Sequence, residues 1–344
     1  MTASDGKSTA ARRPAVRRQH VVPRMLLSGF ADADGNVRVT HRGGRTHLAA
    51  TTNASVVTDF YSFRDADGHL DDTIELWLAN HAESPAAAVL RAAQAGVSPE
   101  PDHVPALARF VAAGLMRTAH VRAVIEGFNE TAGPHLLAME QLTRAGHDPL
   151  TLTARQFDLV LGAARRAWRD ARDENEERKS ILRTVQRQID TFTAKLTTWT
   201  WTVLTADEPL LVTADVAVAP HPQTGTWRGP LPDGFPVYMP VSPTHVLVGE
   251  AHPLGFPTST LTAELAQVVN TELAKSAQNV VITHPTMQWP ANLTLTPITP
   301  ATPQPRIAMS ATENPNTFPA RHREVLDPTI QNTLDALGAV DLVE

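Results

Sequence analysis

The sequence predicts an α+β protein with a small N-terminal β-rich segment, a central helical layer containing one long helix, and a C-terminal mixed β/α portion. Three observations carry this prediction. Residues 36–63 contain short alternating and β-branched runs, the apolar period becomes helical from Thr73, and composition turns β-branched and aromatic again at Thr197. We expect one α+β domain over residues 19–290.

The N-terminal region begins with a polar, basic stretch. Residues 1–18 have the composition of a disordered leader. Two strands are predicted after it, at Asn36–Thr40, where Val37 and Val39 alternate with polar residues, and at Ser55–Phe63.

The helical layer begins at Thr73, where apolar residues return to one face at helical spacing. Ser84-Pro85 predicts an N-cap and first helical position, so a second helix should begin there. Further helices are predicted at residues 103–128 and 134–145.

The long helix is predicted from about Ala154 to Thr197. Apolar residues from Phe157 to Leu196 follow alternating four- and three-residue steps, which is typical of a packed helical seam. Residues 169–179 in its middle are nearly all charged or polar, and we interpret them as a solvated centre between two packed ends.

The C-terminal half predicts strands at residues 199–203, 210–213, 237–240 and 246–249, then a helix at 261–277 and a last apolar strand at 280–283. Thr and Pro accumulate beyond Pro290. Residues 291–344 are therefore expected to form a linker and peripheral tail with one helix near residues 329–337.

Composition limits the chemistry. The chain of 344 residues has no cysteine, so a metal would need His, Asp or Glu ligands. Pro23 and Arg24 interrupt the apolar run that follows the N-terminal arginines, and no stretch reaches the length of a membrane span, so we expect a cytoplasmic protein without membrane partners. The net charge of −6 argues against a whole-surface nucleic-acid binder but leaves room for a local basic groove.

Several short motifs appear in a fixed order. They are Gln19-His20-Val21-Val22-Pro23-Arg24 with Leu27, Phe30 and Ala31; Asp67-Gly68 with Asp71, Ile74-Glu75 and Glu83; Arg117-Thr118; Thr213-Ala214-Asp215; and Pro240-Val241-Ser242-Pro243 with Asn270. Together they resemble the bacterial family called domain of unknown function 4238, over about Gln19 to Val281. The resemblance implies an architecture and a set of positions rather than a reaction. Val216 and Ala217 depart from it, because they stand where the family has Asn-Pro.

Two of these motifs offer proton-transfer groups. His20 has a side chain that titrates near neutrality, and it is interpreted either as a structural residue that hydrogen-bonds backbone groups or as a general base or metal ligand. Glu75 and Glu83 lie eight residues apart, about 80° around an ideal helix. They could share a metal, accept an arginine, or form the polar border of the helix.

Arginines interrupt the apolar stripes of the predicted helix at 103–128. Arg117 falls in one stripe and Arg122 in another, where Glu126 is an i,i+4 partner for Arg122. Burying an unpaired guanidinium costs roughly several kcal/mol, so Arg117 is expected to pair with Glu75, Glu83 or an anionic ligand.

Asp215 follows an apolar run and is expected at a strand end, as a turn-forming or a catalytic carboxylate. No phosphate-binding glycine loop, nucleophile elbow or zinc-protease helix motif is present in the sequence.

Two hypotheses for function remain. In the first, the chain is a hydrolase-like enzyme acting on a phosphate-containing or nucleic-acid substrate. His20 would transfer a proton, Glu75 and Asp215 would bind a divalent ion or act as acid and base, and Arg117 and Arg122 would hold the anion. In the second, the chain is a non-catalytic binding or regulatory module, and the same charges are structural.

Overall fold

A computed structural model describes residues 17–295, except 66, 149–150, 171–173, 221–235, 253–258 and 291–292. The predicted leader up to residue 16 and the predicted tail beyond 295 lie outside the described residues. The architecture is α+β, as predicted. Its contacts divide the chain into two compact units. The first contains Met1–Thr118 and Leu182–Thr299, and the second contains Ala119–Ile181 and Pro300–Glu344. The extent of the predicted domain, 19–290, stays a prediction.

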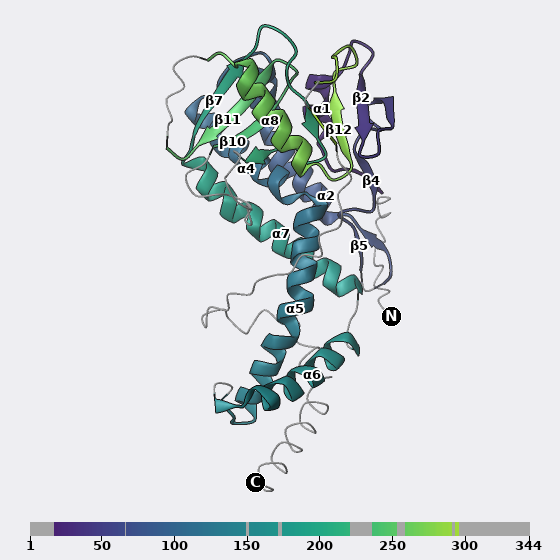
Figure 1. Ribbon diagram of the computed structural model, residues 1–344, viewed down its shortest axis with the longest axis vertical. Helices are drawn as coiled ribbons and strands as arrows, with labels where there is room; N and C mark the ends of the chain where they lie inside the picture. The colour runs from purple at the N-terminus through teal and green to yellow at the C-terminus, as the bar shows by residue number, and fades with distance from the viewer. Residues whose placement is uncertain are drawn as a thin grey trace, which may run out of the picture. The chain divides into compact units, whose positions relative to one another are not determined.

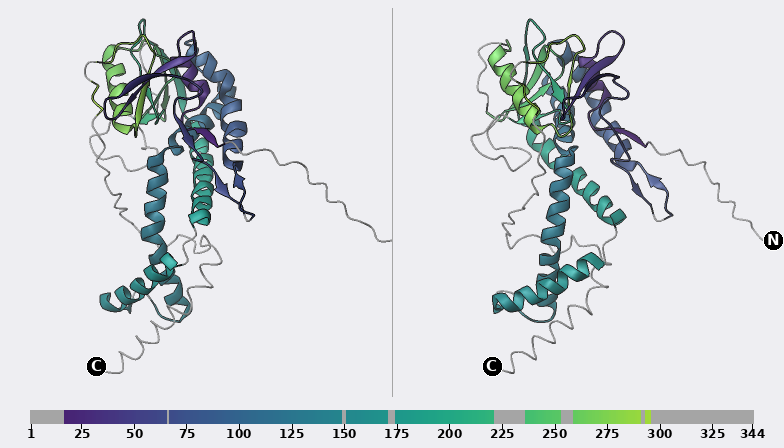
Figure 2. Two further views of the ribbon diagram at one scale, coloured as in Figure 1. Left: turned by 90° about the vertical axis from the view of Figure 1, so that its right-hand side faces the viewer. Right: turned by 45° about the vertical axis from the view of Figure 1, so that its right-hand side comes forward.

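The first unit contains two antiparallel four-stranded sheets (Figure 1). One has the order β7 (Thr200–Thr205), β11 (His245–Glu250), β10 (Val237–Pro240), β9 (Ala219–Pro220). The other has the order β3 (Thr46–Ala50), β2 (Asn36–His41), β12 (Val280–Thr283), β8 (Thr213–Ala214). Because β12 pairs with both β2 and β8, this second sheet joins the beginning of the fold to its end. Its strands β2 and β3 are purple in Figure 2.

Two short antiparallel pairs complete the β structure. β1 (Arg18–His20) pairs with β4 (Val56–Thr58), and β5 (Phe63–Arg64) pairs with β6 (Leu70–Asp71). The first pair fixes the register of His20 opposite Val56.

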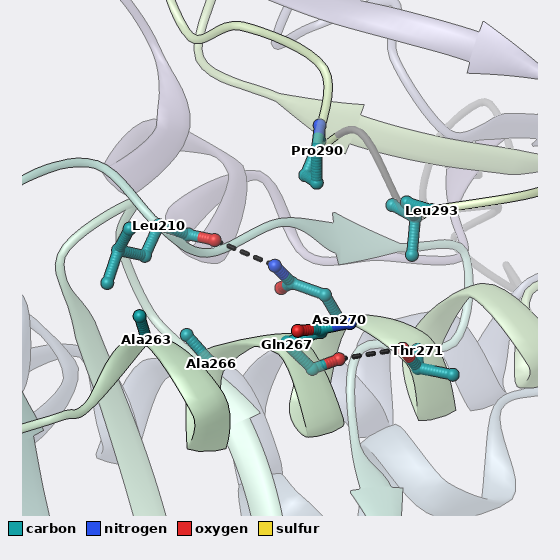
Figure 3. Close-up of a pocket in the computed structure, with 8 residues that line it drawn as sticks. All are labelled: Leu210, Ala263, Ala266, Gln267, Asn270, Thr271, Pro290 and Leu293. Atoms are coloured by element: carbon teal, nitrogen blue, oxygen red, sulfur yellow. Dashed lines mark hydrogen bonds between the residues drawn. The ribbon is translucent and has the colours of Figure 1, made fainter.

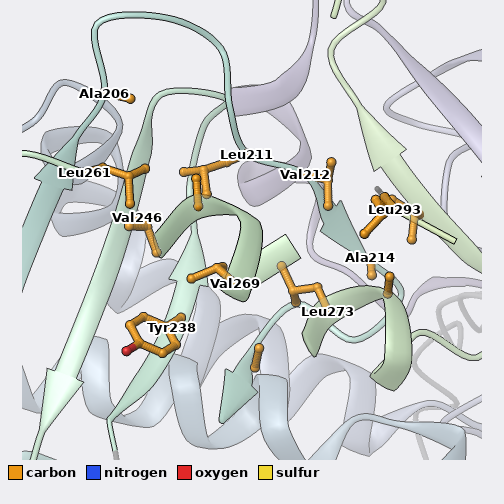
Figure 4. Packing of buried hydrophobic residues seen from close by; sticks show 14 of the residues in the cluster. Ala206, Leu211, Val212, Ala214, Tyr238, Val246, Leu261, Val269, Leu273 and Leu293 are labelled. Carbon is orange, nitrogen blue, oxygen red and sulfur yellow. The ribbon is translucent and has the colours of Figure 1, made fainter. Parts of the chain in front are cut away.

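The two sheets share a core with α8 (Ala263–Ser276), as Figure 4 shows. Val269 and Leu273 of this helix are fully buried among side chains from both sheets. Thr262 caps the helix, since its Oγ1 accepts a hydrogen bond from the Leu265 N–H at 3.2 Å. Each such buried aliphatic side chain stabilises the fold by about 1.5–3 kcal/mol.

A helical block packs against the other side of β11 through α3 (Ser84–Gln94). It also contains α1 (Arg24–Leu27), a 3₁₀ turn (Ser28–Phe30), α2 (Thr73–Leu78), a π-turn (Ala79–Glu83) and α4 (Val104–Met116). Gly29 lies directly against the backbone of Val241, where a Cβ atom would overlap the Val241 carbonyl. This close approach ties the N-terminal motif to the Pro240–Pro243 turn.

The helix predicted at residues 103–128 is two helices. α4 ends at Met116, Arg117 and Thr118 form a bend, and α5 (Ala119–Arg144) begins at once. The helix predicted separately at 134–145 is the second half of α5, which continues through Pro134. The backbone of Arg117 has φ −80° and ψ 23°, outside the helical region, and no Gly or Pro marks the bend in the sequence.

The predicted long helix corresponds to α6 (Ala154–Asp170) and α7 (Glu174–Thr197), and its predicted continuity through 171–173 falls outside the described residues. α6 crosses the C-terminal half of α5 in the second unit (Figure 1). Gly133 allows this approach, because a Cβ there would overlap the Trp168 ring. In the first unit, the Leu196 carbonyl accepts a hydrogen bond from Trp201 Nε1 at 3.1 Å.

Among the described residues, no helix combines the length and apolar character needed to cross a lipid bilayer.

Candidate functional site

Arg117 occupies the bend that ends α4, and its side chain is only 2% exposed. Its Nη2 donates a hydrogen bond to Glu83 Oε1 at 2.6 Å. Burial acts to lower the pKa of Arg117, but the acidic groups around it, Tyr61, Glu83 and Glu75, raise it overall, so the guanidinium stays charged. The predicted pairing of Arg117 with an acid of the first helix is confirmed, with Glu83 as the partner.

Tyr61 covers the other side of the guanidinium, with the Arg117 Cζ 5.5 Å from the centre of its ring. The ring is almost fully buried, and burial raises the pKa of the phenol far above its usual value. Gln19 holds this segment in place. Its Oε1 accepts a hydrogen bond from the Tyr61 N–H at 2.5 Å, and its Nε2 donates to Ser62 Oγ at 2.7 Å.

Glu75 completes a group that we call the Arg117 cluster: Tyr61, Glu75, Glu83 and Arg117. Glu75 lies on α2 and Glu83 ends the π-turn that follows it. A π-turn uses about one residue more than an α-helical turn, because its hydrogen bonds span i→i+5 instead of i→i+4. Eight residues therefore rotate the helix roughly as seven do, which leaves the two carboxylates ~20° apart rather than ~80°. The π-turn places both acids on the side that faces Arg117.

The carboxyl of Glu75 is the unusual titrating group of the cluster. Burial raises its pKa, Arg117 partly opposes this, and Glu83 and Asp72 add to it, so that the pKa is about 7. Its Oε2 is buried without a hydrogen-bond partner in the described structure. Glu83 differs, since it is paired to Arg117 and its side chain is 26% exposed. The cluster thus contains one ion-paired carboxylate and one carboxyl that changes charge near neutral pH.

His20 lies at the end of β1, half-buried, with Nε2 3.3 Å from the Thr51 carbonyl oxygen. A carbonyl only accepts, so Nε2 carries the proton, and Nδ1 has no hydrogen-bond partner among the described residues. Burial lowers the pKa of His20, and the positive charges of Arg24 and Arg18 lower it further. The hydrogen bond to the Thr51 carbonyl and the negative charge of Glu83 act in the opposite direction. Glu83 therefore links His20 electrostatically to the Arg117 cluster.

Asp215 has a different role. It follows β8, and its carboxylate accepts hydrogen bonds from the backbone N–H groups of Gln278, Asn279 and Val280, at 2.8, 2.6 and 3.3 Å. These bind the turn between α8 and β12. The positively charged Arg42 holds the same turn, because its Nε donates a hydrogen bond to the Ala277 carbonyl at 2.8 Å. Among the described residues, none of the interactions of Asp215 involves His20, Glu75 or Arg117, and they give no support to a metal shared by Glu75 and Asp215.

The remaining predicted residue, Arg122, lies on α5, and its side chain falls outside the described residues. Tyr61 of the cluster and Gln19, which holds it, are the site residues that the sequence did not indicate as functional. Gln19 belongs to the first motif, but its contact to Tyr61 depends on the pairing of β1 with β4, which local pattern does not reveal.

A cavity of about 150 Å³ lies elsewhere, beside α8 (Figure 3). Asn270 projects toward it but is engaged on both sides. Its Nδ2 donates to the Leu210 carbonyl at 2.7 Å, and its Oδ1 accepts from the Val212 N–H at 3.0 Å. Asn270 thus fastens α8 to the segment before β8, which gives this motif residue a structural role.

Asp65, Asp67 and His69 form a group of three metal-ligating types in the described residues. They belong to the turn between β5 and β6. The Asp65 carboxylate accepts the N–H groups of Asp67 at 3.1 Å and His69 at 2.8 Å, as expected for a turn-forming aspartate.

Comparison with known proteins gives one result. The sequence model of the family described as Protein of unknown function (DUF4238) matches residues 18–287, which is most of the chain. No curated protein and no solved structure matches.

Proposed function

The chain belongs to the DUF4238 family, and we propose that it is a hydrolase-like enzyme in which Glu75 and His20 transfer protons to and from a phosphate-containing or nucleic-acid substrate. One observation carries this proposal. Two carboxyl groups of one cluster have different environments, since Glu83 is ion-paired to Arg117 while Glu75 has a pKa of about 7. Carboxyl pairs separated in this way are how enzymes obtain an acid or base that works at neutral pH.

His20 supports the same chemistry by its tautomer. The Thr51 carbonyl holds the proton on Nε2, which leaves the lone pair of Nδ1 available as a base. Its lowered pKa keeps the imidazole neutral at pH 7, so a general base is ready without prior deprotonation. In the proposed reaction, the oxygen of a water molecule attacks the phosphorus while Nδ1 of His20 takes a proton from that water. The P–O bond to the leaving group breaks, and protonated Glu75 gives its proton to the departing oxygen.

The sequence suggested Arg117 and Arg122 for the anionic part of the substrate, and the side chain of Arg122 falls outside the described residues. Arg117 is already neutralised by Glu83. Arg24 is exposed at the start of α1, and it and Arg18 lie near enough to His20 to lower its pKa. We therefore assign anion binding to Arg24 and Arg18 in this proposal, and to Arg117 the orientation of Glu83.

The second candidate is a non-catalytic binding or regulatory module whose buried charges are structural. It is favoured by the interactions of Arg117 and Asp215, which are satisfied within the protein. This candidate predicts that Glu75 and His20 serve no chemistry, so their replacement would alter stability alone.

The test compares the hydrolysis of bis-p-nitrophenyl phosphate and of labelled single-stranded RNA by the wild type and by Glu75→Gln and His20→Ala. Glu100→Gln is the control, because it removes an exposed carboxyl outside the cluster. We expect Glu75→Gln and His20→Ala each to lose about 100-fold or more in rate with the control unchanged. Wild-type protein without activity on either substrate, or equal rates in all variants, would favour the non-catalytic module.

A further inference from the structure

The outer face of α6 carries four exposed arginines. We define the basic face as Arg155, Asp158, Leu159, Gly162, Arg165, Arg166 and Arg169. At 100° per residue these positions fall within an arc of about 120°. All except Gly162 are exposed, and the four arginines outnumber Asp158 and the exposed Asp170, which borders the face about 20° beyond Leu159.

The opposite side of α6 is fully committed to its own unit. Val160, Ala163, Ala164 and Ala167 are buried in a core with α5. The basic face therefore points away from α5, and its orientation is fixed by packing rather than by the charges themselves.

These arginines have no partner within the described protein. No ion pair or hydrogen bond of their guanidinium groups is found there, although Asp158 lies on the same face. The end of the Arg166 side chain lies over Gly162, where an added Cβ would be 3.8 Å from Nη1. Since Gly162 has no side chain, the Arg166 guanidinium can lie across the middle of the face.

We propose that the basic face binds the phosphate backbone of a nucleic-acid duplex. Charge complementarity is the argument, because a net positive face on a chain of net charge −6 attracts a polyanion locally. Arg155 and Arg169 are ~21 Å apart along the helix, a length over which duplex DNA presents several phosphates on either strand. Guanidinium groups suit phosphate oxygens through paired N–H donors, and such contacts carry no base specificity.

An anionic membrane fits this face less well. A helix that lies in a lipid interface inserts its apolar side, but the apolar side of α6 is buried against α5. Leu159 is the single large apolar residue on the exposed face. The inference is independent of catalysis at Glu75, which lies in the other unit.

The experiment measures binding of a fluorescein-labelled 20-base-pair DNA duplex by anisotropy from 50 to 300 mM KCl. The variant is the triple change Arg155→Gln, Arg166→Gln and Arg169→Gln, which keeps good helix formers. We expect wild-type affinity to fall with salt, and the triple variant to lose up to ~2.7 from the slope of log K against log[KCl] and about tenfold or more in affinity at 50 mM.

The control removes three exposed arginines from other helices, Arg91→Gln, Arg183→Gln and Arg187→Gln, for the same change in net charge. We expect it, and separately Glu75→Gln, to bind DNA within about twofold of the wild type. A lysine version of the α6 triple should keep the salt slope, because it keeps the charges. Circular dichroism establishes that each variant is folded.

Equal loss in the control triple, or no DNA binding by the wild type at 50 mM KCl, would overturn the proposal. So would binding to phosphatidylserine vesicles in place of DNA. Normal DNA binding by a catalytically inactive Glu75→Gln separates this inference from the proposed hydrolase.

Discussion

Replacing Glu75 with Gln should stabilise the protein, and the gain should depend on pH. The folded-state pKa of about 7 exceeds the ordinary value of 4.5, so between these two pH values the folded state holds a proton that the unfolded state has released. Stability therefore falls as pH rises through this window. Above pH 7 the ionised Glu75 lowers the free energy of unfolding by ~3 kcal/mol, because each tenfold difference in proton affinity between the folded and unfolded states is worth about 1.4 kcal/mol. Gln cannot ionise and removes the penalty.

Urea unfolding of wild type and Glu75→Gln at pH 5, 6, 7 and 8 measures this directly. We expect a gain below ~1 kcal/mol at pH 5 that grows to ~3 kcal/mol at pH 8, with unchanged m-value. Glu100→Gln is again the control, and its exposed carboxyl should give nearly the same small change at each pH. A Glu75→Gln gain that does not change with pH, or a loss at pH 8, would refute the reasoning, because the carboxyl would then be ionised and stabilised by Arg117.

Three further predictions concern stability. Glu83→Ala should cost about 3–5 kcal/mol in urea unfolding, because it leaves the buried Arg117 guanidinium without its ion-pair partner. Adding Arg117→Met should recover much of the loss, and a double variant whose cost equals the sum of the two single costs would contradict this. Asp215→Ala should cost about 2–4 kcal/mol by leaving backbone N–H groups of the turn before β12 unpaired, and an unchanged melting temperature would show that water replaces the carboxylate. Gly29→Ala should cost more than 1 kcal/mol in the same assay, since its Cβ overlaps the Val241 carbonyl, and near-neutral stability would mean that the two segments separate easily.

The sequence was most informative where a buried charge requires a partner of opposite charge. An arginine within an apolar stripe needs an acid, and that argument alone predicted the pairing of Arg117 with the helix that carries Glu75 and Glu83. The strand at 237–240 was predicted as a short segment between Pro- and Gly-rich turns and the strand at 280–283 as an apolar run, and they are present as β10 and β12.

Other features depend on contacts that no local pattern contains. Arg117 and Thr118 form a bend where the sequence predicted helix, although neither is Gly or Pro. Tyr61 reaches the guanidinium because β1 and β4 pair. Asp215 was correctly expected at a strand end, but the turn it binds lies 63 residues later in the chain. It was a candidate site residue because of its residue type and its place after an apolar run. The sequence could not predict its three backbone hydrogen-bond partners, because the folded chain brings them together.

The π-turn between Glu75 and Glu83 means that this helix contains one residue more than its rotation needs. Removing one residue from within Ala79–Ala82 would restore a regular helix and leave both packed ends in place. The spacing of the two acids would fall from eight residues to seven, and both would still face Arg117. Aligned relatives could therefore differ by a one-residue gap here and still keep the same pair of carboxylates. Position counting along this segment would then misassign Glu83, whereas its place opposite the arginine would identify it.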